Sequence, residues 1–254
     1  MSETKYKVKS LAKAMRVLEC FSVKEPELGV TQLAERLNMN KSNVYNIVDT
    51  LREMGYLEQK NNSKYCLGIK MLEYSFIVNE HLGYPRAVYD ILQEISQQSG
   101  EIVYFGIPKQ DKVLYLYVIH PRSRLQVMPY REILGETAPM YCTGIGKAML
   151  SNLPQSEWPD RITKNRIKYT TETITDYDAI IEDLVRCRKR GYAIDDGARE
   201  PGMRCVGMPV FDFHNRLVAG VSISGPMNIL TYQQIPNYVH ILQDATFKMR
   251  ERLY

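Results

Sequence analysis

The sequence predicts an α+β protein with two domains, one mostly helical and one in which helices pack against an antiparallel sheet. Three observations lead to this fold class. The chain has 254 residues, which exceeds the size of one minimal domain. Residues 11–68 contain three amphipathic helical segments followed by two short strand-like segments. Beyond residue 85, helical segments are interspersed with β-branched and aromatic segments that polar turns connect.

The composition is that of a folded protein without a strong overall charge. Hydrophobic residues make up 44% and charged residues 24%, which excludes the polar, aromatic-poor composition of a disordered chain. The net charge is only +4, so any affinity for nucleic acid must come from a local patch. Lys5, Lys7 and Lys9 offer one such patch, a basic N-terminal arm.

Composition also argues against several kinds of site. No stretch of about 18 apolar residues occurs, so we expect no membrane partner and a cytoplasmic location. The five cysteines are scattered and form no C-x-x-C pair, so neither a disulfide framework nor a zinc site is expected. We predict no cofactor, no metal and no catalytic residues.

The N-terminal domain, residues 1–68, begins with three predicted helices. In the segment Leu11–Phe21, with Ser10 as N-cap, one face holds Leu11, Ala14, Met15, Leu18 and Phe21. A short second helix begins at Thr31 after a turn that contains Pro and Gly. The third begins near Lys41, ends at Gly55, and carries an apolar stripe of Val44, Ile47, Val48, Leu51 and Met54.

Two short strands follow the third helix. Residues 56–59 and 64–67 flank the polar tip 60–63, which predicts a hairpin. Three helices followed by a hairpin is the order of a winged helix-turn-helix. In that motif the second helix of the pair enters the major groove of DNA. We therefore expect the helix that begins near Lys41 to read an operator in double-stranded DNA.

The predicted DNA contacts are polar side chains at helix starts, on the outward face of the third helix and at the hairpin. Asn pairs with adenine through two hydrogen bonds, whereas Lys, Ser and Tyr reach bases or phosphates. The helix N-terminus adds unpaired backbone amides that favour a phosphate. The candidates are Thr31, Lys41, Ser42, Asn43, Tyr45, Asn46, Lys60, Asn62 and Lys64.

A linker helix and a second domain complete the chain. Residues 69–84 form the linker, whose segment Ile69–Val78 is amphipathic and which ends at Gly83-Tyr84-Pro85. Residues 85–254 form the second domain. Within it we expect helices at 86–98, 144–153, 176–190 and 232–253, and strands at 101–107, 112–119, 125–129, 192–195, 205–211 and 217–224.

Nearly the whole chain resembles the isocitrate lyase regulator (IclR) family of bacterial transcription regulators. The resemblance lies in the segments SLAKAMRVLECF, TQLAERLNMNKSNVYNIVDTLREMGYLEQ, YCLG, TGIGKAML and GYAIDDGAREPGMRCVGMPVFD. The last segment departs from the family at Ala198, where Glu is usual. The third helix departs at Asn43 and Asn46, where Thr and Arg are more typical, so operator sequences of relatives are not carried over.

The resemblance implies a GAF/profilin-like, effector-binding C-terminal domain, homodimers through the winged-helix region, and pairing of dimers into a homotetramer. Carried over residue by residue, it implies an effector site formed by Val127, Tyr130, Gly144, Ile145, Asp195, Met203, Cys205, Ser222 and Ser224.

The residues themselves fit an acidic effector. Residues 143–147 begin a helix with glycines, which let backbone amides approach a carboxylate, although the same glycines can serve close packing. Ser222 and Ser224 lie two apart on a strand and project to the same face, inward or toward water. Asp195 would repel a bare anion but can accept from a hydroxyl, which favours a hydroxy acid or sugar acid.

The predicted function is a DNA-binding transcription regulator, a repressor in preference to an activator, whose operator binding responds to a small acidic metabolite. Two alternatives remain open. One is an enzyme with Cys205 as nucleophile, Asp195 as orienting group and His120, His214 or His240 as base, although no nucleophile motif surrounds Cys205. The other is an adaptor that uses the winged helix for protein contacts.

Overall fold

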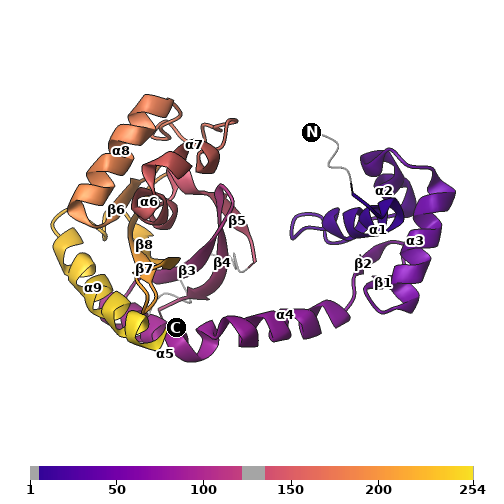
Figure 1. Cartoon of the computed structure of the whole chain (residues 1–254), viewed down its shortest axis with the longest axis horizontal. Helices are drawn as coiled ribbons and strands as arrows, with labels where there is room; N and C mark the ends of the chain where they lie inside the picture. The colour runs from indigo at the N-terminus through magenta and orange to yellow at the C-terminus, as the bar shows by residue number, and fades with distance from the viewer. Residues whose placement is uncertain (1–5, 122–134, 254) are drawn as a thin grey trace. The chain divides into compact units, whose positions relative to one another are not determined.

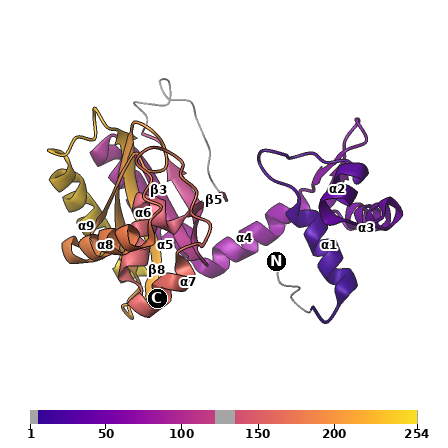
Figure 2. The same cartoon turned by 90° about the horizontal axis from the view of Figure 1, so that it is seen from above.

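The computed structural model describes residues 6–121 and 135–253 of the chain. The chain forms two compact units, Met1–Leu82 and Gly83–Tyr254 (Figures 1 and 2). The expected strand at 125–129, the site residues Val127 and Tyr130, and Lys5 of the basic arm lie outside the described residues. Among the described helices, none is long and apolar enough to cross a membrane.

The first unit has the predicted order of helices and hairpin. Its elements are α1 (Lys9–Glu19), α2 (Val30–Leu37), α3 (Lys41–Glu53), β1 (Leu57–Gln59), β2 (Tyr65–Leu67) and α4 (Lys70–Leu82). The strands pair antiparallel, with Glu58 opposite Cys66. A buried apolar core joins the three helices to the hairpin and includes Val17, Leu18, Leu28, Leu33, Val44, Val48, Leu51, Leu57 and Tyr65.

The apolar face predicted for the first helix is partly wrong. Leu11 is 60% exposed and Met15 is 49% exposed, whereas Val17 and Leu18 are buried. Only the C-terminal end of α1 reaches the core that α2 and α3 form, so helical periodicity alone overstated the buried face. Ser10 is not the N-cap, because the helix already begins at Lys9.

Helix α4 is longer than the predicted segment and, within the described structure, carries no buried residue. Leu72 and Phe76 are each 66% exposed, and Ile69, Ile77 and Val78 are exposed as well. A helix with so many apolar side chains in water is unusual for a monomeric protein. This helix is included in the first unit rather than separated from it.

The second unit is a six-stranded sheet with helices on both faces, which confirms the predicted α+β class (Figure 1). Its helices are α5 (Tyr84–Ser99), α6 (Gly144–Asn152), α7 (Trp158–Arg161), α8 (Tyr177–Arg190) and α9 (Ile235–Arg252). Its strands are β3 (Ile102–Lys109), β4 (Lys112–Ile119), β5 (Thr137–Pro139), β6 (Ala193–Asp196), β7 (Met203–Phe211) and β8 (Leu217–Pro226).

The strand order is β5-β4-β3-β8-β7-β6, with every neighbouring pair antiparallel. Successive side chains of a strand point to opposite faces of the sheet. Gly207 of β7 lies against the backbone of Gly144 in α6, whereas the next residue, Met208, lies beside Thr246 of α9. Helices α6 and α9 therefore cover opposite faces of β7.

Sequence signals define the ends of the two helices nearest the candidate effector site. The Thr143 side chain accepts a hydrogen bond from the Gly146 amide and caps α6. Asp176 accepts from the Ala179 amide at 2.9 Å and caps α8, which ends at Gly191 in a left-handed conformation. Strand β5, helix α7 and the short 3-10 helices were not predicted, because three or four residues are too few to show periodicity.

Candidate nucleic-acid interface and effector site

The exposed face of α3 carries the side chains predicted to contact DNA. Val44 and Val48 are fully buried in the core of the first unit. This orientation leaves the polar side chains at the start of the helix exposed, namely Lys41, Ser42, Asn43, Tyr45 and Asn46, and Thr31 at the start of α2 is also exposed. The structure therefore presents these residues to solvent as the periodicity indicated.

A hollow of about 300 Å³ lies beside the start of α3. Two cations of α1, Lys13 and Arg16, line it together with the α2–α3 turn and Asn43. Periodicity could not place α1 beside this turn, because the contact depends on how the helices pack. The only signal was the excess of basic residues near the N-terminus.

The wing hairpin presents its polar residues unequally. Lys60 is exposed at the tip. The Asn62 side chain donates to the Glu27 carboxylate at 3.0 Å and accepts from the Lys64 amide at 3.0 Å. Both the NH2 group and the carbonyl oxygen of the Asn62 side chain are thus bonded within the protein, so Asn62 holds the wing in place. Lys64 is half-buried.

In the second unit, adjacent strands bring together four predicted effector residues, which we call the polar cluster: Asp195, Cys205, Ser222 and Ser224. In the register, Asp195 of β6 lies opposite Cys205 of β7, and Cys205 lies opposite Ser224 of β8. The Ser224 hydroxyl donates to the Cys205 sulfur at 2.9 Å. Asp195, Ser222 and Ser224 are each at most 3% exposed, so neither serine faces water.

The N-terminus of α6 packs directly onto this part of the sheet. A Cβ on Gly144 would lie 3.0 Å from the Cβ of Cys205, and a Cβ on Gly207 would lie 2.4 Å from the Gly144 carbonyl oxygen. The glycines therefore serve close packing, the alternative that the sequence left open. The Ile145 side chain is buried beneath Gly220, and a Cβ on Gly207 would lie 2.7 Å from the Ile145 backbone nitrogen.

Asp195 is a buried carboxyl with few compensating contacts. Its Oδ1 accepts from the Ala198 amide at 2.8 Å. Burial raises the pKa of Asp195 to about 6, although the positive charge of Lys147 and the Ala198 hydrogen bond act in the opposite direction. The carboxyl therefore changes charge close to neutral pH.

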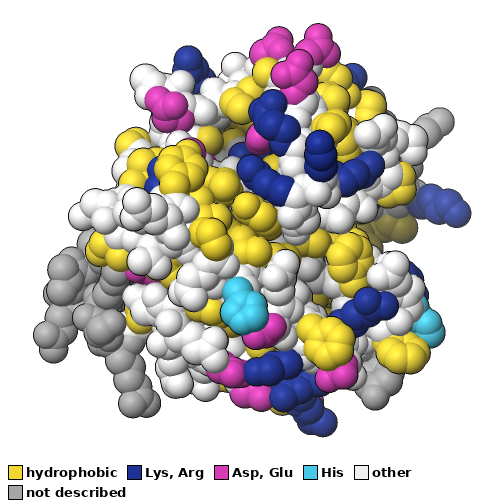
Figure 3. Space-filling model, turned by 90° about the vertical axis from the view of Figure 1, so that its left-hand side faces the viewer, with side chains coloured by type: hydrophobic (Ala, Val, Ile, Leu, Met, Phe, Trp, Pro, Cys, Tyr) yellow, Lys and Arg dark blue, Asp and Glu magenta, His cyan; other side chains and the backbone are white. Residues whose placement is uncertain are grey.

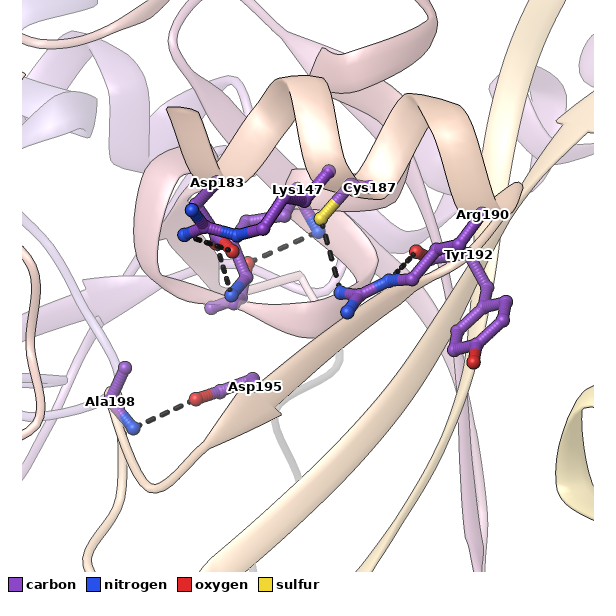
Figure 4. A network of polar contacts seen from close by, with 10 residues as sticks. Lys147, Asp183, Cys187, Arg190, Tyr192, Asp195 and Ala198 are labelled. Atoms are coloured by element: carbon purple, nitrogen blue, oxygen red, sulfur yellow. Dashed lines mark hydrogen bonds and ion pairs between the residues drawn. The ribbon is translucent and has the colours of Figure 1, made fainter. Parts of the chain in front are cut away.

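Lys147 of α6 is held by a second carboxylate. Its Nζ lies 2.8 Å from Oδ2 of Asp183 on α8, and the two side chains are 9% and 14% exposed (Figure 4). In the same view Asp195 points toward Ala198. Lys147 is thus a structural tie between α6 and α8, with Asp195 only within electrostatic reach.

The structure does not assemble the enzyme considered as an alternative. Burial and the negative charge of Asp195 raise the pKa of the Cys205 thiol, which keeps it protonated and weakly nucleophilic. Within the described residues, the hydrogen-bond partner of Cys205 is a serine, and His240 lies near Asp244 on the exposed side of α9. Met203 and Cys205 are half-buried, whereas Asp195, Ser222 and Ser224 are buried.

Sequence reasoning missed three residues of this region, Tyr104, Tyr169 and Arg199. Tyr104 of β3 lies opposite Ser222 in the register, and its ring centre is 5.7 Å from that of Tyr115 on β4. Arg199 follows Ala198 and places its guanidinium 3.9 Å above the ring of Tyr169. Alternation on β3 could have indicated Tyr104, but nothing in the sequence placed Tyr169 next to Arg199.

Comparison with known proteins identifies both units. Residues 10–61 match the IclR helix-turn-helix domain, and residues 81–250 match the family described as bacterial transcriptional regulator IclR C-terminal. The chain belongs to the IclR family. This membership confirms the resemblance found in the sequence, and it identifies a transcriptional regulator with a DNA-binding domain and an effector-binding domain.

Named relatives in the IclR family are similar over nearly the full chain. The HTH-type transcriptional regulator KdgR of Escherichia coli is 31% identical over 248 residues, which cover 97% of this chain and 93% of KdgR. The E. coli transcriptional repressor IclR is 26% identical over 235 residues, which cover 91% and 85% of the two chains. The crystal structure of Thermotoga maritima IclR superposes on this chain with a TM-score of 0.74. The two sequences are 30% identical, and the match covers 96% of this chain and 98% of that chain.

These relatives are transcriptional regulators, not enzymes. IclR-family membership therefore argues against the enzyme alternative built on Cys205, in agreement with the raised pKa of its thiol.

Proposed function

We propose that this IclR-family chain is a cytoplasmic repressor that binds an operator through α3 and is controlled by a small acid bound at the polar cluster. The observation that carries the proposal is the exposed polar face of α3, held by a buried core and followed directly by a wing. A repressor is favoured over an activator because the 26% identical relative from E. coli is named a repressor.

The proposed DNA contacts fall into base-reading and phosphate-binding groups. In this proposal Asn43 and Asn46 read bases, and Lys41, Ser42 and Tyr45 hold the DNA backbone. Thr31, Lys60 and Lys64 contact DNA at the edges of this surface. Lys13 and Arg16 in the adjoining hollow extend the positive surface. Asn62 contributes by fixing the wing, since both ends of its amide are already bonded.

The proposed effector is a small hydroxy acid or sugar acid. We place its carboxylate near Gly144 and Ile145, at the N-terminus of the nine-residue helix α6, where the partial positive charge of the helix favours an anion. Ser222 and Ser224 supply buried hydroxyls from one face of β8, and Asp195 can accept from an effector hydroxyl. Met203 and Cys205 complete the site at its partly exposed side.

Exposed apolar surface supports self-association as a homodimer or homotetramer. In the first unit, Leu11 and Met15 of α1 and Leu72 and Phe76 of α4 are exposed, which favours contact with a second copy. In the second unit, hydrophobic side chains lie beside groups of Lys and Arg on the side that carries α8 and α9 (Figure 3). Such a surface is compatible with the pairing of dimers.

Communication between the sites is proposed to run through α4, which follows the wing and precedes α5. Two reading helices in a dimer must match the spacing of two half-sites. An effector that changes how the second units hold the α4 helices would change this spacing and hence operator affinity. The test is operator affinity measured with and without a bound acid.

The charge of Asp195 predicts pH-dependent acid binding. Its pKa is raised to about 6, so the carboxyl is neutral below this pH and repels an anion above it. We expect gluconate, whose own carboxylate stays ionised, to bind more tightly at pH 5.5 than at pH 7.5. The difference in affinity should be at most about tenfold for each unit by which bound gluconate raises the pKa of Asp195. Isothermal titration calorimetry measures this difference.

Asp195→Asn should bind gluconate with nearly the same affinity at both pH values, because the amide stays neutral. The control is Asp178→Asn, which removes an exposed carboxylate at the start of α8 and should leave the pH dependence intact. Equal affinity of the wild-type chain at both pH values would show that the Asp195 charge does not face the effector.

A further inference from the structure

Arg199 lies in a loop whose backbone is fixed. The Thr170 hydroxyl donates to the Gly197 carbonyl at 2.7 Å, and the buried Thr173 hydroxyl donates to the Ala198 carbonyl at 2.6 Å. The Ala198 amide in turn donates to Asp195 of the polar cluster at 2.8 Å. Arg199 is the next residue, so its Cα is held at a fixed place beside the cluster.

Arg199 is half-buried, and its guanidinium forms no ion pair in the described part of the chain. The guanidinium carbon of Arg199 lies over the ring face of Tyr169, 3.9 Å from the ring centre. A cation that stacks on an aromatic face keeps its N–H groups at the edge free for an acidic partner. Among the described residues, the adjacent carboxylate of Glu200 is exposed and forms no ion pair with Arg199, and Asp195 is bonded to a backbone amide instead.

The guanidinium also lies on the side of the loop that faces the sheet. Tyr169 packs against the core cluster that contains Tyr115 and Cys142. The positive charge of Arg199 acts to lower the pKa of both the Tyr115 phenol and the Cys142 thiol, against a larger effect of burial. Its charge therefore reaches the face of the sheet where the polar cluster lies.

Lys147, the cation that acts on Asp195, is already used. Lys147 is paired with Asp183 in a largely buried contact (Figure 4). An acid with one carboxylate at the start of α6 would leave Arg199 without a partner. A guanidinium binds a carboxylate through two parallel hydrogen bonds, which makes it a specific receptor for an acidic group.

We propose, on the premise that the cluster binds a small acid, that Arg199 stacked on Tyr169 binds a second acidic group of the effector. Arg199 is thus a specificity-determining residue, and the effector class is a small hydroxylated dicarboxylate. The α6 N-terminus and the serines take one end of the diacid, and Arg199 takes the other.

The test compares pairs of acids that differ at one end, where the diacid carries a second carboxylate. Glucarate is matched with gluconate, and malate with lactate, and each is titrated into the full-length wild-type chain by calorimetry. We expect at least one diacid to bind about tenfold or more tightly than its monoacid. In Arg199→Gln this preference should disappear, while monoacid affinity stays within about twofold. Arg250→Gln, which removes an exposed guanidinium on α9, should keep the preference.

The outcomes separate this inference from the proposed function. Monoacids that bind as tightly as diacids, or a diacid preference that survives in Arg199→Gln, would overturn the role of Arg199 and leave acid binding intact. Binding of none of the four acids by the wild-type chain would overturn acid recognition at the cluster and the role of Arg199 with it.

Discussion

Asn46→Ala is expected to weaken operator binding by about 5- to 150-fold for each reading helix, which corresponds to about 1–3 kcal/mol. Asn46 is exposed near the start of α3, and its carboxamide can pair with adenine in the major groove. Its backbone carbonyl already accepts from Thr50, so the substitution leaves the helix bonding unchanged. The loss should be large on the operator and small on unrelated DNA.

Lys41→Ala on the same helix provides a contrast, because a phosphate contact carries no sequence information. It should weaken binding to all sequences and reduce the slope of log affinity against log salt by about 1 per reading helix. Fluorescence anisotropy with an operator selected from random DNA measures both effects. Gln93→Ala, an exposed amide on α5, is the control. Wild-type affinity in both α3 variants would contradict the assignment of these residues to DNA, and affinity that is insensitive to salt would favour the adaptor alternative.

Asp183→Ala is expected to destabilise the second unit by about 3–5 kcal/mol, because it leaves the Lys147 charge buried without its partner. For a chain of this size that corresponds to a fall in melting temperature of roughly 6–20 °C. The single tryptophan, Trp158, is buried in the second unit, so its fluorescence reports the unfolding of that unit.

Two further variants isolate the ion pair. Glu182→Ala removes an exposed partner of Arg186 on the same helix and should cost less than about 1 kcal/mol. Replacement of both charges, Lys147→Met with Asp183→Leu, should recover most of the lost stability, because no unpaired charge stays buried. If Asp183→Ala melts at the same temperature as Glu182→Ala, the pair does not tie α6 to α8.

The fold was predictable where one local pattern decided the structure. The apolar stripe of α3 predicted both its core contacts and its outward polar face, because Val44 and Val48 are one turn apart and both are buried. Strands β7 and β8 followed from β-branched residues around a polar turn. The face of α1 was not predictable, because Leu11 has the right spacing but lies beyond the reach of the core.

The candidate effector site was predictable only in part. The family resemblance named Asp195, Cys205 and the two serines, and the register brings them together. The glycine-rich start of α6 was compatible with ligand approach or with packing, and only the distance from Gly144 to Cys205 shows the packing. Arg199 was missed because its contact with Tyr169 joins residues 30 positions apart in irregular segments.

The central claim is that a small acid at the polar cluster controls DNA binding by α3. The most direct measurement is operator affinity of the full-length chain, by anisotropy at constant salt and pH, with increasing concentrations of the acid that binds most tightly by calorimetry. We expect operator affinity to change by about 5- to 150-fold, the range of typical coupling between two sites. The acid concentration at the midpoint should match its calorimetric affinity, and Asp195→Asn should shift that midpoint. An operator affinity that stays constant while the acid saturates the chain would contradict the claim.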